Sequence, residues 1–300
     1  MISRVFDADV SLADAIRRAL DALLGSLDLE PLGEDRFRGR NELGRFGRVF
    51  GGQTVAQALV AASATVEGKD PHSLHAYFVE TGDLAQPLEI GVERVRDGRS
   101  VATRRVTVVQ GERTLLVAMA SFEANRDLPV HPLPARATSV PDDLPLLQEW
   151  FRDLPEEQQG QVGIWIEQPP PFEMRIGEPP SFASGRPGDG PRTHWLRLPQ
   201  PIGSDPLLHA AVLAYGSDYL LLDMTLRAHP DRVSSELLSG FSVDHSLWLH
   251  APVRFDEWHY YTQEAVAISG DRGLVRGSIR HGDGHLVATV MQEVIVRADG

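Results

Sequence analysis

The chain contains no cysteine, no long apolar run and relatively few basic residues. The absence of cysteine excludes thiolate nucleophiles, disulfides and cysteine zinc sites. Nowhere do about 18 apolar residues follow one another, which argues against a membrane-spanning helix. The first 20 residues carry acids and arginines where a signal peptide would have an apolar run. We therefore expect a cytoplasmic protein without stable membrane insertion.

Positive charge is the second shortage: 29 Lys and Arg residues face 42 Asp and Glu residues, for a formal net charge of -13. This balance argues against nucleic-acid binding, which depends on clustered Lys and Arg. The basic stretch RVRDGRSVATRR at 94–105 holds five arginines against a single aspartate. It is either a solvated hairpin face or a cradle for a small phosphorylated ligand, because guanidinium groups bind phosphate oxygens bidentately.

Prolines divide the rest of the chain into two parts. Sixteen of the 21 prolines lie between Pro129 and Pro206, a density typical of a linker. The length of 300 residues fits two domains, and the content of 42% hydrophobic and 24% charged residues is that of a soluble, packed protein. We expect an N-terminal domain over 1–124, a linker over 125–168 and a C-terminal domain over 169–300.

The two parts resemble each other. HSLHAYFVETGD at 72–83 leads to GERTLLVAMASFE at 111–123, and HSLWLHAPVRFDEW at 245–258 leads to GDGHLVATVMQEV at 282–294. From the HSL start to the closing glutamate the spacing is 51 residues in one copy and 48 in the other. Spacing this similar indicates a duplication. The alternating runs within each copy predict antiparallel strands joined by glycine-containing turns.

Each copy also has one apolar helix before its main strands. GGQTVAQALVAASATV at 51–66 is rich in alanine and begins on a glycine pair, which allows close approach to a sheet. The stretch 204–228 opens with Asp205 as N-cap and a proline at the first helical position. Either Gly216 kinks this helix, or Ser217 caps a second segment and splits it. The pattern predicts an α+β arrangement in which a sheet wraps one helix, twice.

A glutamine interrupts the last apolar strand, LVATVMQEVIV at 286–296. Gln292 shares its face of that strand with four apolar neighbours, Ala288, Val290, Val294 and Val296. A buried amide without hydrogen-bond partners costs about 1 to 3 kcal/mol. The Gln292 side chain is therefore expected to have polar partners from elsewhere in the chain, or a use.

Six strings together resemble one known family: RFGRVFGGQTVAQAL, HSLHAYFVETGD, RVRDGRSVATRRV, LAYGSDYLLLD, SVDHSLWLH and GDGHLVATVMQEVIVR. In this order they are similar to the type II acyl-CoA thioesterases, the TesB-like double hotdog proteins, from about Leu32 to Arg297. The resemblance implies a double hotdog fold, with two antiparallel sheets that each wrap one long apolar helix. It also implies hydrolysis of fatty acyl-CoA to free fatty acid and CoA.

The resemblance further implies a catalytic set that falls on Asp218 in YGSDY, Ser242 in FSVDHS and Gln292 in VMQEV. Thioester hydrolysis needs a water oriented toward the carbonyl carbon and donors for the oxyanion, so we expect no metal or other cofactor. The carboxylate would accept or orient the proton of the water, while the hydroxyl and the amide fix the same water. Gln292 is then explained as a partner of Asp218 and water.

Further candidates surround this set. The N–H groups of Gly51 and Gly52 are candidates for the oxyanion hole, since a helix N-terminus presents unpaired donors. His75 is a candidate ligand contact, with a hydrogen-bonded structural histidine as the competing interpretation. Arg96 and Arg99 are candidates to meet the CoA phosphates.

Two other patterns have simpler explanations. Asp244 and His245 follow Ser242 closely, but residues so near on one strand rarely converge into a triad, and no G-x-S-x-G elbow is present. HGDGH at 281–285 faintly suggests a metal site, for which a glycine-rich hairpin tip is the better account. We therefore predict no metal ligands.

The duplication predicts one active constellation per chain, because aligning the closing glutamates puts Phe122 opposite Gln292. Two other functions stay open on the sequence alone: a hotdog enoyl-CoA hydratase and a non-catalytic acyl-CoA binding protein. The hydratase chemistry usually wants a paired Asp and His in a helix-leading loop, which we do not find. A homo-oligomer is expected by analogy of fold, because hotdog sheets expose edges that often pair.

Overall fold

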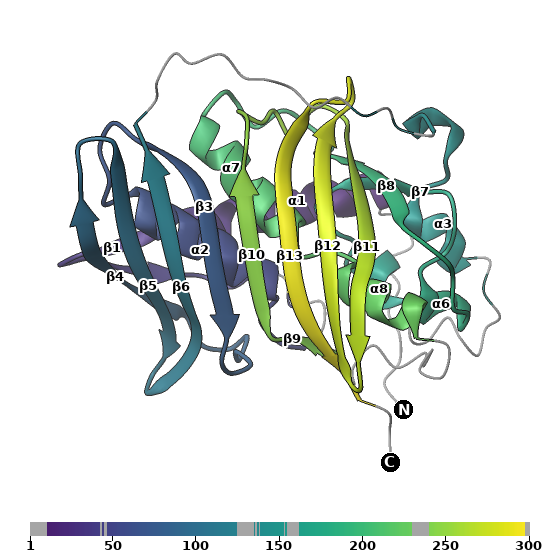
Figure 1. The fold of residues 1–300 in the computed structure, drawn as a ribbon, viewed down its shortest axis with the longest axis horizontal. Coiled ribbons are helices and arrows are strands. Elements are labelled where there is room, and N and C mark those ends of the chain that lie inside the picture. The colour runs from purple at the N-terminus through teal and green to yellow at the C-terminus, as the bar shows by residue number, and fades with distance from the viewer. Residues whose placement is uncertain are drawn as a thin grey trace.

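One antiparallel sheet organises the chain. The computed structural model describes residues 11–42, 44, 47–124, 135, 137, 139–152, 154, 162–229 and 240–297. The strands are β1 (Glu30–Gly33), β2 (Arg36–Gly39), β3 (Asp70–Phe78), β4 (Leu88–Asp97), β5 (Val101–Gln110), β6 (Arg113–Glu123), β7 (Glu173–Ile176), β8 (Arg192–Arg197), β9 (Gly240–Ser242), β10 (Asp244–Leu249), β11 (His259–Ser269), β12 (Arg272–His281) and β13 (Leu286–Val296). Their order is β1-β2-β4-β5-β6-β3-β10-β13-β12-β11-β8-β7, and β9 pairs with β13 (Figure 1).

The helices are α1 (Leu12–Leu27), α2 (Gly51–Ser63), α3 (Leu147–Arg152), α5 (Ile164–Glu167), α6 (Ser181–Ser184), α7 (Pro206–Gly216) and α8 (Leu221–Ala228), with a 3-10 turn at Pro141–Asp143. In Figure 1, α1, α2, α7 and α8 lie behind the sheet. Helix α2 packs on β3, β4 and β5, and α8 packs on β11, β12 and β13, so each half of the sheet has its own buried helix. Within the described residues, no helix is both long and apolar enough to cross a membrane.

The sequence predicts two sheets, and the structure joins them into one. Strands β3 and β10 are the inner edges of the two halves, and they pair from Ser73 opposite Trp248 to Tyr77 opposite Asp244. An open edge strand presents a row of unpaired N–H and C=O groups, and this pairing satisfies them. The two HSL stretches therefore run antiparallel, side by side, at the middle of the sheet.

The second apolar helix is split, which was one of the two alternatives for 204–228, although Ser217 is the C-cap of α7 and does not cap α8. The one long helix that the resemblance implies is therefore wrong for this half. A turn at 217–220 separates α7 from α8. Side chains from β11 hold this turn: Tyr261 donates to the carbonyl of Ser217, and Gln263 donates to the carbonyl of Tyr219, both at 2.8 Å. Buried backbone carbonyls outside a helix or strand need hydrogen-bond partners, so these bonds stabilise the turn that breaks the helix.

The two buried helices approach each other closely at Gly52 of α2. A Cβ at this position would lie 2.5 Å from the carbonyl oxygen of Tyr215 on α7. The missing side chain is what lets the N-terminus of α2 reach the end of α7. By contrast, Gly25 in α1 is exposed, and a Cβ there would meet no atom within 4 Å.

These two glycines predict opposite effects of the same substitution. We expect Gly52→Ala to lower the free energy of unfolding by about 1 to 3 kcal/mol, because the methyl group forces a packed backbone apart. Gly25→Ala, at an open helical position, should raise it by about 0.5 to 1 kcal/mol. Urea denaturation of both variants measures the difference. Equal effects of the two substitutions would contradict the close approach.

Candidate active site

A cavity of about 370 Å³ lies where the start of α2 meets the turn between α7 and α8. Its volume is in the range typical of small-molecule sites, about 300 to 1,000 Å³. The wall comes from the start of α2, the segment after β3, the 217–220 turn with α8, and strands β9 and β13. Both halves of the chain therefore enclose one hollow, which has more apolar than polar side chains.

Asp218 lies in this wall, in the turn between α7 and α8, and is 9% exposed. Its Oδ2 accepts a hydrogen bond from the N–H of Gly52 at 2.8 Å. Burial raises the pKa of Asp218 above its ordinary 3.8, while His245, the Gln292 amide, Gly52 and Arg48 oppose that rise. Burial is the largest of these influences, so the carboxylate is a stronger base than an exposed aspartate.

The amide of Gln292 is buried and has a polar partner at each end. Its Nε2 donates to Oγ of Ser242 at 2.7 Å, and its Oε1 is 2.5 Å from Nδ1 of His245. The predicted buried face of β13 is confirmed, since alternate residues from 288 to 296 are buried. Asp218, Ser242 and Gln292 all line the same cavity. The structure thus brings the three predicted residues together from a turn, β9 and β13.

His245 belongs to this network, and sequence analysis missed it. It is fully buried on β10, and its Nε2 is 2.8 Å from Oγ of Ser217. Sequence reasoning considered it only for a triad, in which Asp244 would be its partner. The Asp244 side chain instead accepts a backbone N–H of β13 at 2.7 Å. The available signal was the duplication, which predicts that the strand of His245 and the strand of Gln292 lie in one sheet.

The predicted contacts on α2 and β3 divide between the cavity and the surface. Gly51 lines the cavity. The N–H of Gly52 is donated to Asp218, which leaves Gly51 as the oxyanion candidate. His75 is exposed on the sheet and lies outside the cavity wall, with its ring edge-to-face against Trp248 at 4.9 Å between centroids. Its contact is one of packing on the sheet surface.

The predicted phosphate contacts Arg96 and Arg99 are exposed at the hairpin of β4 and β5, outside the cavity wall. Their neighbour Arg104 is buried and donates to Asp97 at 2.5 Å. These positions favour the hairpin interpretation of the basic stretch over a cradle at this cavity. Arg48, which sequence analysis did not single out, does line the cavity.

Two aromatic residues of the wall come from segments that sequence analysis assigned to no site. Trp165 lies on α5, within the predicted linker, and its ring stacks on that of Phe182 of α6 with centroids 5.5 Å apart. Asp223 of α8 anchors α6, because it accepts the N–H of Phe182 at 2.8 Å and pairs with the buried Arg192. No local pattern could reveal this wall, because the contacts join distant parts of the sequence.

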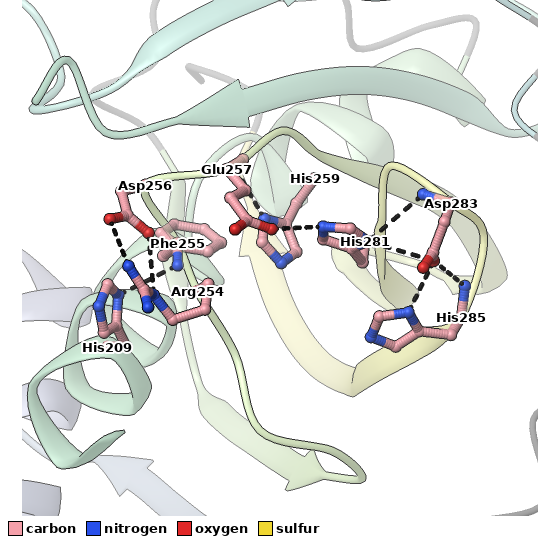
Figure 2. A network of polar contacts seen from close by, with 9 residues as sticks. All are labelled: His209, Arg254, Phe255, Asp256, Glu257, His259, His281, Asp283 and His285. Carbon is pink, nitrogen blue, oxygen red and sulfur yellow. Dashed lines mark hydrogen bonds and ion pairs between the residues drawn. The ribbon is translucent and has the colours of Figure 1, made fainter. Parts of the chain in front are cut away.

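A second polar cluster lies at the tip of the hairpin between β12 and β13 (Figure 2). Oδ1 of Asp283 accepts the N–H of His285 at 3.0 Å and lies 2.6 Å from its Nδ1, while Nε2 of His281 is 2.8 Å from a carboxylate oxygen of Glu257. The three residues of the tip lie close enough to share a cation. Their hydrogen bonds form a turn held by an aspartate, so the predicted hairpin tip is confirmed, and the absence of a metal ligand there stays a prediction.

The first half of the chain has no matching constellation among the described residues. Phe122, the predicted counterpart of Gln292, is fully buried on β6 and lies outside the cavity wall. Gln53 of α2 accepts the N–H of Glu42 at 3.1 Å and donates to Asn41 at 3.1 Å. The amide of Gln53 is therefore bonded away from the cavity. The amide in the cavity wall is that of Gln292, from the second half of the chain.

Two protein-family models match most of the chain. Residues 41–123 match the model described as acyl-CoA thioesterase N-terminal domain, and residues 129–296 match the model described as acyl-CoA thioesterase C-terminal domain. The human protein acyl-coenzyme A thioesterase 8 is 36% identical over 280 residues, which cover 90% of this chain and 87% of that protein. Acyl-CoA thioesterase 2 of Haemophilus influenzae is 31% identical over 283 residues, which cover 93% of this chain and 98% of that protein.

Solved structures agree with the sequence relatives. An acyl-CoA thioesterase II from Mycobacterium marinum has a TM-score of 0.72 at 33% identity, covering 93% of this chain and 99% of that one. A tesB protein from Mycobacterium avium subs paratuberculosis has a TM-score of 0.75 at 29% identity, covering 93% of this chain and 100% of that one. The similarity therefore extends over nearly the whole length of both chains.

The raised pKa of Asp218 predicts how stability depends on pH. The folded protein holds a proton at this group more tightly than the unfolded chain, so the contribution of Asp218 to stability is present at low pH and lost as pH rises through the folded-state pKa. Asp218→Asn cannot titrate. We therefore expect the melting temperature of the variant, relative to the wild type, to increase between about pH 4 and pH 8. Thermal unfolding at several pH values tests this, and a constant or shrinking difference would contradict it.

Proposed function

The chain belongs to the acyl-CoA thioesterase family and is a thioester hydrolase, and from that premise we propose that it hydrolyses fatty acyl-CoA with water activated by Asp218, Ser242 and Gln292. The observation that carries the catalytic assignment is that these three side chains line one cavity, with the amide bonded to the hydroxyl at 2.7 Å. The products are a free fatty acid and CoA.

Asp218 is the general base in this proposal. It takes a proton from a water as the water oxygen bonds to the thioester carbonyl carbon, and the resulting tetrahedral intermediate then releases the CoA thiolate, which regains a proton. No residue becomes acylated. Burial raises the pKa of the Asp218 carboxyl. A general base works best when its pKa is near the pH of the reaction, so this rise favours proton transfer near neutral pH.

Ser242 and Gln292 orient the water. Because the Ser242 Oγ accepts from Nε2 of Gln292, its own hydroxyl proton remains to be donated toward the site. The second N–H of the same amide faces Asp218 and favours its charged form. In this proposal the N–H of Gly51, at the start of α2 in the cavity wall, donates to the oxyanion.

The substrate follows from the lining of the cavity. Apolar side chains such as Phe78, Leu115 and Trp165 suit an acyl chain. Arg48 supplies a positive charge in the wall for the anionic CoA portion. Contact of Arg96 and Arg99 with the CoA phosphates stays a prediction, and these residues would have to meet the ligand beyond the cavity.

The repeated halves support a double hotdog fold in which each unit contributes a sheet and a buried helix. In this division the units cover 1–124 and 169–300, with 125–168 between them. The inner edges β3 and β10 pair with each other, as expected for two such units fused in one chain. A cytoplasmic homo-oligomer acting in lipid metabolism is the setting that we propose.

Turnover is tested by mixing the protein with acyl-CoAs of increasing chain length and detecting free thiol with a disulfide reagent. We expect thiol release by the wild type and a loss of about 10² to 10⁴ in kcat for Asp218→Asn, since the amide cannot accept the proton of the water. Asp205→Asn is the matched control, because this exposed N-cap of α7 keeps a capping oxygen. Its turnover should equal that of the wild type.

Three outcomes would overturn the proposal. Normal turnover by a folded Asp218→Asn variant would show that Asp218 is not the general base. Loss of enoyl-CoA absorbance without free thiol would favour a hydratase, and binding of acyl-CoA without any turnover would favour a binding protein.

A further inference from the structure

His245 is buried, and both of its ring nitrogens face polar side chains. Nδ1 is 2.5 Å from Oε1 of Gln292, and Nε2 is 2.8 Å from Oγ of Ser217. The residue lies outside the cavity wall as described, so it does not touch a ligand there. Any influence of His245 on the reaction has to pass through Gln292.

The direction of these hydrogen bonds follows from the amide of Gln292. For its Nε2 to donate to Ser242 at 2.7 Å, its Oε1 has to face His245. A carbonyl oxygen only accepts hydrogen bonds, so Nδ1 of His245 has to carry the proton. The hydroxyl of Ser217 donates to the carbonyl of Ala214 at 2.8 Å, so its Oγ is left to accept from Nε2 of His245, and both ring nitrogens then act as donors.

Reversing the amide would exchange its two ends. The carbonyl oxygen of Gln292 would then face Ser242 and the cavity, and the carboxylate of Asp218 would meet a lone pair in place of an N–H. The apolar residues that share the face of Gln292, such as Val290 and Val294, offer no partner that could decide between the two orientations. Two contacts therefore fix the amide: the carboxylate of Asp218 requires an N–H on its side, and Nδ1–H of His245 requires the carbonyl oxygen on the other side.

We propose that His245 is a positioning residue whose Nδ1–H fixes which end of the Gln292 amide faces the reacting water. The inference rests on the proposed function of the cavity. It assigns a role in hydrolysis to a side chain that contacts neither the substrate nor the reacting water. It also explains why a histidine is buried on β10, next to β13.

Two substitutions separate this role from simple filling of space. In His245→Asn the side-chain amide nitrogen can take the place of Nδ1, whereas in His245→Gln it reaches the place of Nε2 and leaves Oε1 of Gln292 without a donor. We expect His245→Asn to keep kcat within about threefold of the wild type. His245→Gln should lose about 10- to 100-fold in kcat, as is usual for partners that orient a functional side chain, with KM within about threefold.

A matched control is His209 on α7, which is also buried. Its Nδ1 accepts the N–H of Phe255 (Figure 2), and its Nε2 donates to the carbonyl of Gly203. It lies outside the cavity wall. His209→Gln should lower the melting temperature with kcat unchanged. If His245→Asn and His245→Gln instead lose kcat equally, or lose none, the orienting role is refuted.

A second measurement is made on the wild type and uses a folded His245→Asn variant only to assign the signals. In protein labelled with ¹⁵N-histidine, the ring nitrogen signals that disappear in His245→Asn belong to His245. We expect a protonated Nδ1 in the wild type, and a neutral ring protonated at Nε2 alone would overturn the inference. Because this readout needs no turnover, it is independent of the thiol-release assay, whose failure would count against the proposed function instead.

Discussion

A carboxylate taken out of water is costly unless donors replace the water, and the site of this protein is arranged around that constraint. Asp218 is buried at the break between α7 and α8, where the N–H of Gly52 donates to it at 2.8 Å. The amide of Gln292 and the charges of His245 and Arg48 also favour its ionised form. The compensation is incomplete, so the pKa of Asp218 stays raised, which suits a group that has to accept a proton.

That compensation needs both halves of the chain. Gly52 comes from α2 of the first half, while Asp218 and Gln292 come from the second. The close contact of α2 with α7 requires a glycine at position 52, and the pairing of β3 with β10 joins the two halves in one sheet. The fold therefore places the donor and the carboxylate on different copies of the repeat, which is consistent with one such set per chain.

Features that depend on neighbouring residues could be predicted from the sequence. The Asp205 cap of α7 is confirmed by its hydrogen bond to the N–H of Leu207 at 3.0 Å, and the buried face of β13 follows from its alternation. Gln292 lies among apolar residues on one face of β13, and this position correctly indicated that its amide has polar partners. Family resemblance, rather than local pattern, brought Asp218 and Ser242 to notice.

Features set by tertiary contacts could not be predicted. The sequence left a kink and a split of the helix at 204–228 open, and the hydrogen bonds of Tyr261 and Gln263 from β11 select the split. The aromatic wall depends on the contact of Trp165 with Phe182. The N–H of Gly52 was predicted to contact the oxyanion, but it donates to the carboxylate of Asp218. Each of these outcomes is fixed by the relative placement of elements that are distant in the sequence, on which local composition has no bearing.

The most direct test of the central claim is the pH dependence of kcat/KM for acyl-CoA hydrolysis, measured for the wild type and for Gln292→Leu. The account predicts an acid limb with a midpoint above the ordinary aspartate value of 3.8. It also predicts that this midpoint moves to higher pH in Gln292→Leu, because the variant lacks the amide that favours the charged carboxylate. A limb that stays in place or moves to lower pH in the variant would contradict a base held in its charged form by Gln292.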